Sequence, residues 1–159
     1  MPDDPAAERA NAFPWPPLLF IGAVAAAYAL GAFAPIAWPG TDDGPARVIG
    51  LGLGIAGIAL VVWATWTLRR HDTTVMPHGV STTLATSGPY RRFRNPIYLG
   101  EAMLLLGAAE ATKNVWFVAA AFVFAILITQ LQILPEERHL EARFGDAYVR
   151  YKAASRRWI

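Results

Sequence analysis

The sequence predicts an all-α integral membrane protein: a helical bundle with four transmembrane helices and a C-terminal amphipathic helix. Of the 159 residues, 55% are hydrophobic and 16% are charged, which is too apolar for an ordinary soluble domain of this length. The apolar residues are also concentrated, because three stretches of about twenty residues carry no formal charge. We therefore interpret residues 1–159 as a single membrane domain.

The first two spans are predicted at residues 17–37 and 46–69. Trp15 and Trp38 bracket the first like the aromatic anchors of a membrane interface, and Pro45 stands where a helix commonly begins. The second span contains glycines at positions 50, 52, 54 and 57. We interpret this series as a surface for close packing against another helix.

The third and fourth spans are predicted at residues 96–110 and 115–134. The third is short and contains Glu101, so we expect it to start inside the membrane interface. Only a polar turn at residues 110–114 separates the two spans, which predicts an antiparallel hairpin. Glu110, at this turn, is interpreted as a solvated helix end.

The C-terminal helix is predicted at residues 136–152. A proline and two glutamates follow Leu134 and are expected to end the apolar span. Beyond them, large apolar and aromatic residues recur at helical spacing among charged ones: Leu140, Phe144, Tyr148 and Tyr151. This pattern is typical of an amphipathic helix lying along lipid headgroups.

The loop at residues 70–95 is predicted to have a defined shape. Gly88-Pro89 and Asn95-Pro96 each force a bend, since proline fixes its own φ and restricts the residue before it. Between these bends the loop places tyrosine and arginine side chains. We therefore expect polar chemistry held at a membrane surface.

Positive charge is distributed unevenly and predicts the orientation. The loop before the third span and the C-terminal tail are rich in arginine, whereas the opposite loops contribute only Arg47 and Lys113. The sequence thus predicts a multi-pass protein of the inner (cytoplasmic) membrane with its active site facing the cytoplasm. Nucleic-acid binding is the alternative interpretation of the basic tail, but membrane topology alone accounts for these charges, so no nucleic-acid partner is expected.

No metal site is expected. The chain has no cysteine, and its three histidines, His71, His78 and His139, lack the spacing of metal ligands. A thiolate nucleophile and a disulfide framework are excluded for the same reason.

Two segments resemble a known family. SGPYRRFRNPIYLG is similar to the GPY…RHPxYxG signature of the isoprenylcysteine carboxyl methyltransferase family and its phospholipid methyltransferase relatives. EERHLEARFGDAYVRYK resembles the second half of that signature, a glutamate pair followed by FG and two tyrosines. The resemblance covers roughly residues 80–152, with both blocks in the expected order and separation.

The resemblance implies a methyltransferase that uses S-adenosyl-L-methionine, enclosed by the loop, the hairpin and the C-terminal helix. The cofactor-binding positions that it implies are Thr82, Thr83, Leu84, Ala85, Tyr90, Asn95, Pro96, Ile97, Tyr98 and Glu136. The family often has histidine where this chain has Asn95. Asn95 cannot take any role that needs an imidazole, but its amide can still form hydrogen bonds.

Physical reasoning gives several of these residues a role. Glu136 is suited to bind the cofactor's ammonium or ribose hydroxyls, and Tyr90 and Tyr98 are suited to pack against its adenosine. Arg94 and Glu101 are the predicted catalytic residues, Arg94 to hold a carboxylate and Glu101 to orient an amine or accept its proton. The structural alternatives are solvated helix-end charges and interfacial anchors.

The acceptor is expected to be a lipid or other lipophilic molecule that enters from the bilayer. The eukaryotic prenylcysteine enzymes have an arginine, associated with the substrate carboxylate, four residues before the cofactor glutamate, and this chain has Gln132 there. Gln132 is therefore the predicted substrate-binding residue, and it disfavours a prenylcysteine carboxylate because it has no positive charge. A lipid amine, a quinone-like or isoprenoid molecule, and a small hydrophobic compound remain open.

Two other functions are compatible with the sequence. Sterol reductases share a related C-terminal block and use NADPH, but they have many more spans than 159 residues can form. A non-catalytic membrane scaffold, in which the loop only organises headgroups or a partner, is the second alternative. Cofactor binding distinguishes all three.

Overall fold

The computed structural model describes residues 13–39, 44–70 and 84–159. Over these residues the chain is all-α, with the elements α1 (Trp15–Phe33), α2 (Gly44–Arg70), a 3₁₀ turn η1 (Gly88–Arg91), α3 (Pro96–Thr112), α4 (Trp116–Ile128), a π-helical segment η2 (Thr129–Ile133), α5 (Leu134–Phe144) and α6 (Asp146–Ala154). Much of the predicted loop 70–95, including Thr82 and Thr83, lies outside the described residues.

Among the described residues, three helices are long and apolar enough to cross a membrane: Trp15–Phe33, Gly44–Arg70 and Trp116–Phe144. Most of the surface of the first two faces away from the rest of the chain, as expected for helices in contact with lipid. These helices indicate a multi-pass integral membrane protein. The four-helix transmembrane prediction is not confirmed, because α3 has 17 residues, about 25 Å at the usual helical rise, against a hydrocarbon core of about 30 Å.

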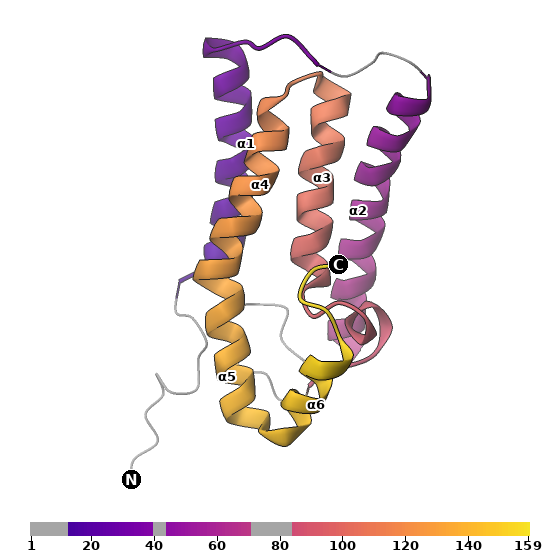
Figure 1. Cartoon of the computed structure of the whole chain (residues 1–159), viewed down its shortest axis with the longest axis vertical. Helices are drawn as coiled ribbons and strands as arrows, with labels where there is room; N and C mark the ends of the chain where they lie inside the picture. Colours follow the sequence, from indigo (N-terminus) through magenta and orange to yellow (C-terminus); the bar gives the residue numbers. More distant parts are fainter. Residues whose placement is uncertain (1–12, 40–43, 71–83) are drawn as a thin grey trace.

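The long helices lie side by side in the order α1, α4, α3, α2 (Figure 1). The apolar core fills the space where α1, α3 and α4 meet, and its buried members include Ala27, Leu105, Phe117, Phe124 and Ile128. Phe20 of α1 packs edge-on against Phe124, with ring centroids 6.0 Å apart. Neighbouring helices alternate in direction, so the end of α2, the start of α3, α5 and α6 lie at the same end of the bundle (Figure 1).

Glycines allow α2 and α3 to approach closely. A Cβ atom on Gly57 would lie 2.6 Å from the backbone oxygen of Gly100, and one on Gly54 would lie 3.2 Å from the Cα of Gly107. A Cβ on Gly50 would lie 2.5 Å from the Cγ atom of the Glu110 side chain. The predicted packing role of the glycine series is thus confirmed at positions 50, 54 and 57, whereas a Cβ on Gly52 meets no atom within 4 Å.

The α3–α4 hairpin is confirmed at the predicted turn. Lys113 ends α3 in the left-handed conformation, with φ of 52°. Asn114 then donates a hydrogen bond of 2.9 Å to the carbonyl of Ala27 and accepts one from the Trp116 amide, which ties the turn to α1. The interpretation of Glu110 as a solvated helix end is wrong, because Glu110 is buried against α2 and pairs with Lys113.

The polypeptide does not leave the helix at Leu134. Instead α4, η2 and α5 form one long helix, and Pro135 lies in the first turn of α5 (Figure 1). The wide π turn just before Pro135 gives a physical reason, since it relieves the clash of a proline ring with the preceding helical turn. The predicted helix 136–152 is corrected accordingly: it is divided at Gly145, whose φ is 51°, and its first half extends α4.

Candidate functional site

The 3₁₀ turn η1 directs one tyrosine inward at the end of α2. Tyr90 is 8% exposed and packs in a small apolar cluster with Ala64 and Ala85. Gly88 permits this position because its φ is 57° and because a Cβ there would lie 2.7 Å from the Thr67 hydroxyl. The glycine of the Gly88-Pro89 bend therefore seats the loop directly on α2.

Three parts of the chain converge on Glu136. Burial raises the pKa of the Tyr90 phenol above its ordinary value, and the carboxylate of Glu136 raises this pKa further. The phenol of Tyr98, in the first turn of α3, lies within the electrostatic range of Glu136, Glu101 and Tyr90. The loop, the start of α3 and the long C-terminal helix thus place two tyrosines and two carboxylates in one neighbourhood.

The π segment places Gln132 toward the same neighbourhood. Gln132 is fully buried, and its Nε2 donates to Oε2 of Glu136 over 3.4 Å, a long hydrogen bond. A π turn adds a residue to a helical turn, so the residues after it are rotated about the helix axis and present different side chains to a given neighbour. Such turns occur frequently at functional sites, and here one separates the apolar α4 from the charged α5.

Glu101 contributes a carboxylate oxygen without a partner. Its Oε2 is buried and accepts no hydrogen bond from any described residue. Neither Glu101 nor Glu136 forms an ion pair with a lysine or arginine in the described ranges. A buried carboxylate with no cation beside it is costly, so this neighbourhood is suited to receive a positively charged ligand.

Arg94 and Asn95 face the end of the chain. Arg94 donates to Oε1 of Glu137 over 3.1 Å and to the carbonyls of Lys152 and Ser155 over 2.9 and 2.6 Å. Asn95 donates from Nδ2 to the carbonyl of Arg157 over 3.1 Å. These contacts favour a structural role for both residues, and their catalytic and cofactor-binding roles stay predictions.

The last residues of the chain, the C-terminal strap (155–159), support this neighbourhood and were not predicted from the sequence to do so. The backbone of Arg156 bonds to Arg94 and Arg92, with Arg94 N donating over 2.7 Å and Arg156 N donating over 2.8 Å. Arg157 pairs with Glu137 over 2.7 Å, and the Trp158 indole donates to Thr129 over 3.3 Å. An arginine pair and a tryptophan beyond the last predicted helix were the only sequence signal for this strap.

The strap and α6 also hold η1 in place. The Tyr151 hydroxyl donates a 2.7 Å hydrogen bond to the carbonyl of Tyr90. Glu137, which the sequence analysis left without a role, joins Arg94 to Arg157 with a side chain that is only 7% exposed. The polar network that supports Tyr90 is therefore formed by Arg94, Glu137, Tyr151 and Arg157, which lie far apart in sequence.

The remaining predicted cofactor residues are described in part. Ala85 and Ile97 lie in the cluster around Tyr90, Pro96 is buried at the start of α3, and Leu84 is partly buried. Their contact with a cofactor stays a prediction.

The fold and the site define a multi-pass membrane protein with a partly buried tyrosine–carboxylate cluster, formed by Tyr90, Tyr98, Glu101 and Glu136, at the end of its helical bundle. The phospholipid methyltransferase family model matches residues 45–147, which include all of α2 after its first residue, both tyrosines and both carboxylates of this cluster. The chain therefore belongs to the phospholipid methyltransferase family, whose members are membrane methyltransferases that use S-adenosyl-L-methionine.

One curated relative is similar over part of the chain. An uncharacterized protein of Haemophilus influenzae is 38% identical over 63 residues, which are 40% of this chain and 100% of that protein. No solved structure matches this chain.

Proposed function

We propose that this chain transfers a methyl group from S-adenosyl-L-methionine to a lipophilic acceptor at the cytoplasmic surface of the membrane. The observation that carries the proposal is that Tyr90 and Tyr98 both lie within the electrostatic range of Glu136, although the α3–α4 hairpin separates them from it in sequence. Membership of the phospholipid methyltransferase family supports the same reaction and favours it over the NADPH-dependent alternative.

The residues present fit this cofactor. S-adenosyl-L-methionine carries an ammonium and a sulfonium, and Glu101 and Glu136 are carboxylates with no cationic partner among the described residues. In our proposal Glu136 binds the ammonium or the ribose hydroxyls, and the rings of Tyr90 and Tyr98 pack against the adenosine. Ala85 and Ile97 supply an apolar wall.

The bound cofactor supplies an electrophilic methyl group. The chain's own contribution is to align the acceptor, exclude water and manage a proton where the nucleophile carries one. Glu101 has a buried oxygen free to accept that proton from an amine or hydroxyl. Gln132, fully buried beside Glu136, contributes an uncharged hydrogen-bonding group to the acceptor side of the site.

Arg94 acts in this proposal as a positioning residue. Its guanidinium is occupied by Glu137 and two backbone carbonyls, so it fixes the neighbours of Tyr90 and Tyr98 without contacting the acceptor. A lipid that enters sideways between the helices suits a site at the end of a bundle whose outer surfaces are apolar.

The direct test is a titration of the purified protein in nanodiscs with S-adenosyl-L-methionine and S-adenosylhomocysteine. We expect saturable micromolar binding that Glu136→Ala abolishes and that Tyr90→Phe weakens. Asp146→Ala, which removes an exposed carboxylate from α6, is the matched control and should bind normally. Absence of binding in every membrane mimetic would refute the proposal and favour a non-catalytic scaffold.

Transfer of a labelled methyl group into membrane extracts then identifies the acceptor class. Label in a lipid amine, in an isoprenoid or quinone, or in a small hydrophobic compound would each select one of the open alternatives. Glu101→Gln should reduce transfer more than it reduces cofactor binding, because its proposed role concerns the acceptor's proton.

A further inference from the structure

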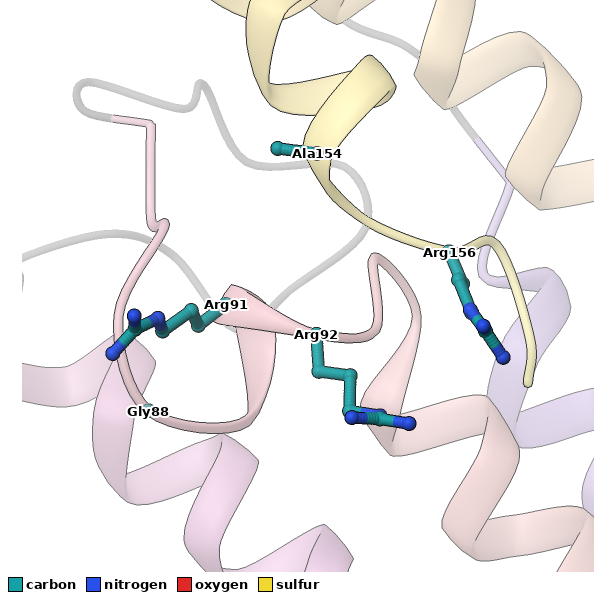
Figure 2. A pocket seen from close by; sticks show the side chains of 5 residues that line it. All are labelled: Gly88, Arg91, Arg92, Ala154 and Arg156. Atoms are coloured by element: carbon teal, nitrogen blue, oxygen red, sulfur yellow. The ribbon is translucent and has the colours of Figure 1, made fainter.

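The outer face of η1 borders a surface cavity that the proposed reaction does not use. Its volume is about 410 Å³, and Gly88, Arg91, Arg92, Ala154 and Arg156 line it. The same turn directs Tyr90 inward and the two arginines outward, and all three lining arginines are exposed. Figure 2 shows Arg92 and Arg156 extending to the same side of their segments, while Arg91 extends from η1 in another direction.

Backbone hydrogen bonds hold two of these arginines, Arg92 and Arg156, beside each other. The hydrogen bonds between Arg156 and residues Arg92 and Arg94, 2.8 and 2.7 Å long, place the strap beside the end of η1. Among the described residues no carboxylate lines the cavity, and none of the three guanidiniums has an ion-pair partner there. Like charges held close together without a counter-charge repel one another, so an anion in the cavity would be stabilising.

The chemistry and the position of the cavity favour one kind of anion. Arginine binds phosphate oxygens through a planar pair of N–H donors. The cavity lies where α2 ends at Arg70 and α3 begins at Pro96, which is the level at which apolar helices meet the lipid headgroups. A volume of about 410 Å³ is also much larger than a phosphate ion and is in the range of sites for small organic groups.

We propose that the arginine cavity binds the phosphodiester of an anionic membrane lipid headgroup. This site is separate from the tyrosine–carboxylate cluster and does not depend on the proposed function. By holding a lipid against both η1 and the strap, it would couple the membrane surface to the segments that support Tyr90.

The test measures binding of dihexanoyl-phosphatidylglycerol to the purified full-length chain in a nonionic detergent by calorimetry. The double variant Arg92→Gln/Arg156→Gln should weaken this binding about 30-fold, as expected for the loss of two arginines at an anionic headgroup. The control Arg138→Gln/Arg150→Gln removes the same charge from exposed positions outside the cavity and should bind within about 3-fold of the unaltered protein.

Two further ligands distinguish a lipid headgroup from a free phosphate ion. Inorganic phosphate and the zwitterionic dihexanoyl-phosphatidylcholine should both bind at least tenfold more weakly than the anionic lipid. If inorganic phosphate binds as tightly as the anionic lipid, the cavity is a site for free anions and not for a lipid headgroup. If both double variants lose the same affinity for the lipid, the binding is due to diffuse surface charge and not to the cavity. Either result, or absence of binding, overturns the proposal, while a thermal unfolding midpoint equal to that of the unaltered protein shows that the cavity variant is folded.

Discussion

Arg94 forms hydrogen bonds with three residues of the C-terminal region, and its side chain is only 10% exposed. The sequence predicted that it would hold a carboxylate, and in the structure the carboxylate beside it is that of Glu137. A ligand would have to displace these contacts to reach its guanidinium. Residue type alone indicated the chemistry of the side chain, but the partner was determined by the fold.

Replacing Arg94 with methionine should therefore lower stability. The change leaves two carbonyls and part of the Glu137 carboxylate without their donor, and we expect a loss of about 3 kcal/mol in unfolding free energy. Thermal unfolding in detergent provides the measurement. Arg138→Met, at an exposed position, is the control and should be nearly neutral. A midpoint for Arg94→Met equal to that of the control would show that the network contributes little.

Tyrosine ionisation predicts how stability changes with alkaline pH. Burial raises the pKa of Tyr151 from 10.0 to about 12, because its phenol is less favourable as an anion in the folded chain. As pH rises, the unfolded chain therefore releases the Tyr151 proton before the folded chain does. The contribution of Tyr151 to the free energy of unfolding is fully present below pH 10.0 and is lost as pH rises toward about 12.

Thermal unfolding at a series of pH values from neutral to strongly alkaline tests this sign. Tyr151→Phe should start from a lower midpoint, because it loses the hydrogen bond to the carbonyl of Tyr90. The same variant should lose less additional stability in the alkaline range than the unaltered chain. An identical alkaline loss in both proteins would assign the effect to other tyrosines.

At the scale of elements, the contact between α2 and α3 depends on residues that lack a side chain. A Cβ at position 57 would lie 2.6 Å from a backbone oxygen that cannot move independently of α3. Gly52, one and a half turns away, faces open space. The glycine series in the sequence indicated a packing surface, but the partner helix and the tolerant position were visible only in the structure.

Gly57→Ala should consequently destabilise the protein by roughly 1–3 kcal/mol, the usual cost of overpacking a tight contact. Gly52→Ala adds the same methyl group at an open position and should be neutral or slightly stabilising, since alanine favours helix more than glycine does. Unfolding midpoints of the two variants in the same detergent provide the comparison. Equal midpoints would mean that α2 and α3 readjust without cost.

At the scale of the whole molecule, the C-terminal strap closes the network that supports the proposed site. It pairs with the backbone near Arg94, binds Glu137 through Arg157 and reaches Thr129 through Trp158. These contacts join the loop between α2 and α3 to the long helix that carries Glu136. The strap is therefore predicted to matter for ligand binding although it contributes no residue to the tyrosine–carboxylate cluster.

Removal of residues 155–159 should weaken S-adenosylhomocysteine binding about tenfold, equivalent to about 1.4 kcal/mol, because η1 loses part of its support. Removal of Ile159 alone, a residue that is 82% exposed, should leave binding unchanged. Calorimetry of both truncated proteins in nanodiscs decides the matter. Normal binding without the strap would show that α6 and Tyr151 are sufficient to hold η1.

The sequence by itself determined the class of fold, the two N-terminal spans, the α3–α4 hairpin and the family. These features follow from local properties: charge-free runs of helical length, a short polar turn, and two motifs of fixed spacing. Gly88-Pro89 and Asn95-Pro96 likewise marked real boundaries, since η1 begins at Gly88 and α3 begins at Pro96.

Only the tertiary structure decided the continuation of α4 through Pro135, the partners of Arg94 and Asn95, and the course of the strap. The physical reason is that each depends on groups that are distant in sequence. Pro135 is accommodated by the π turn before it, and Arg94 is 43 residues from the glutamate that it binds. Local propensity sets which helices form, whereas long-range hydrogen bonds and burial select how their polar ends meet.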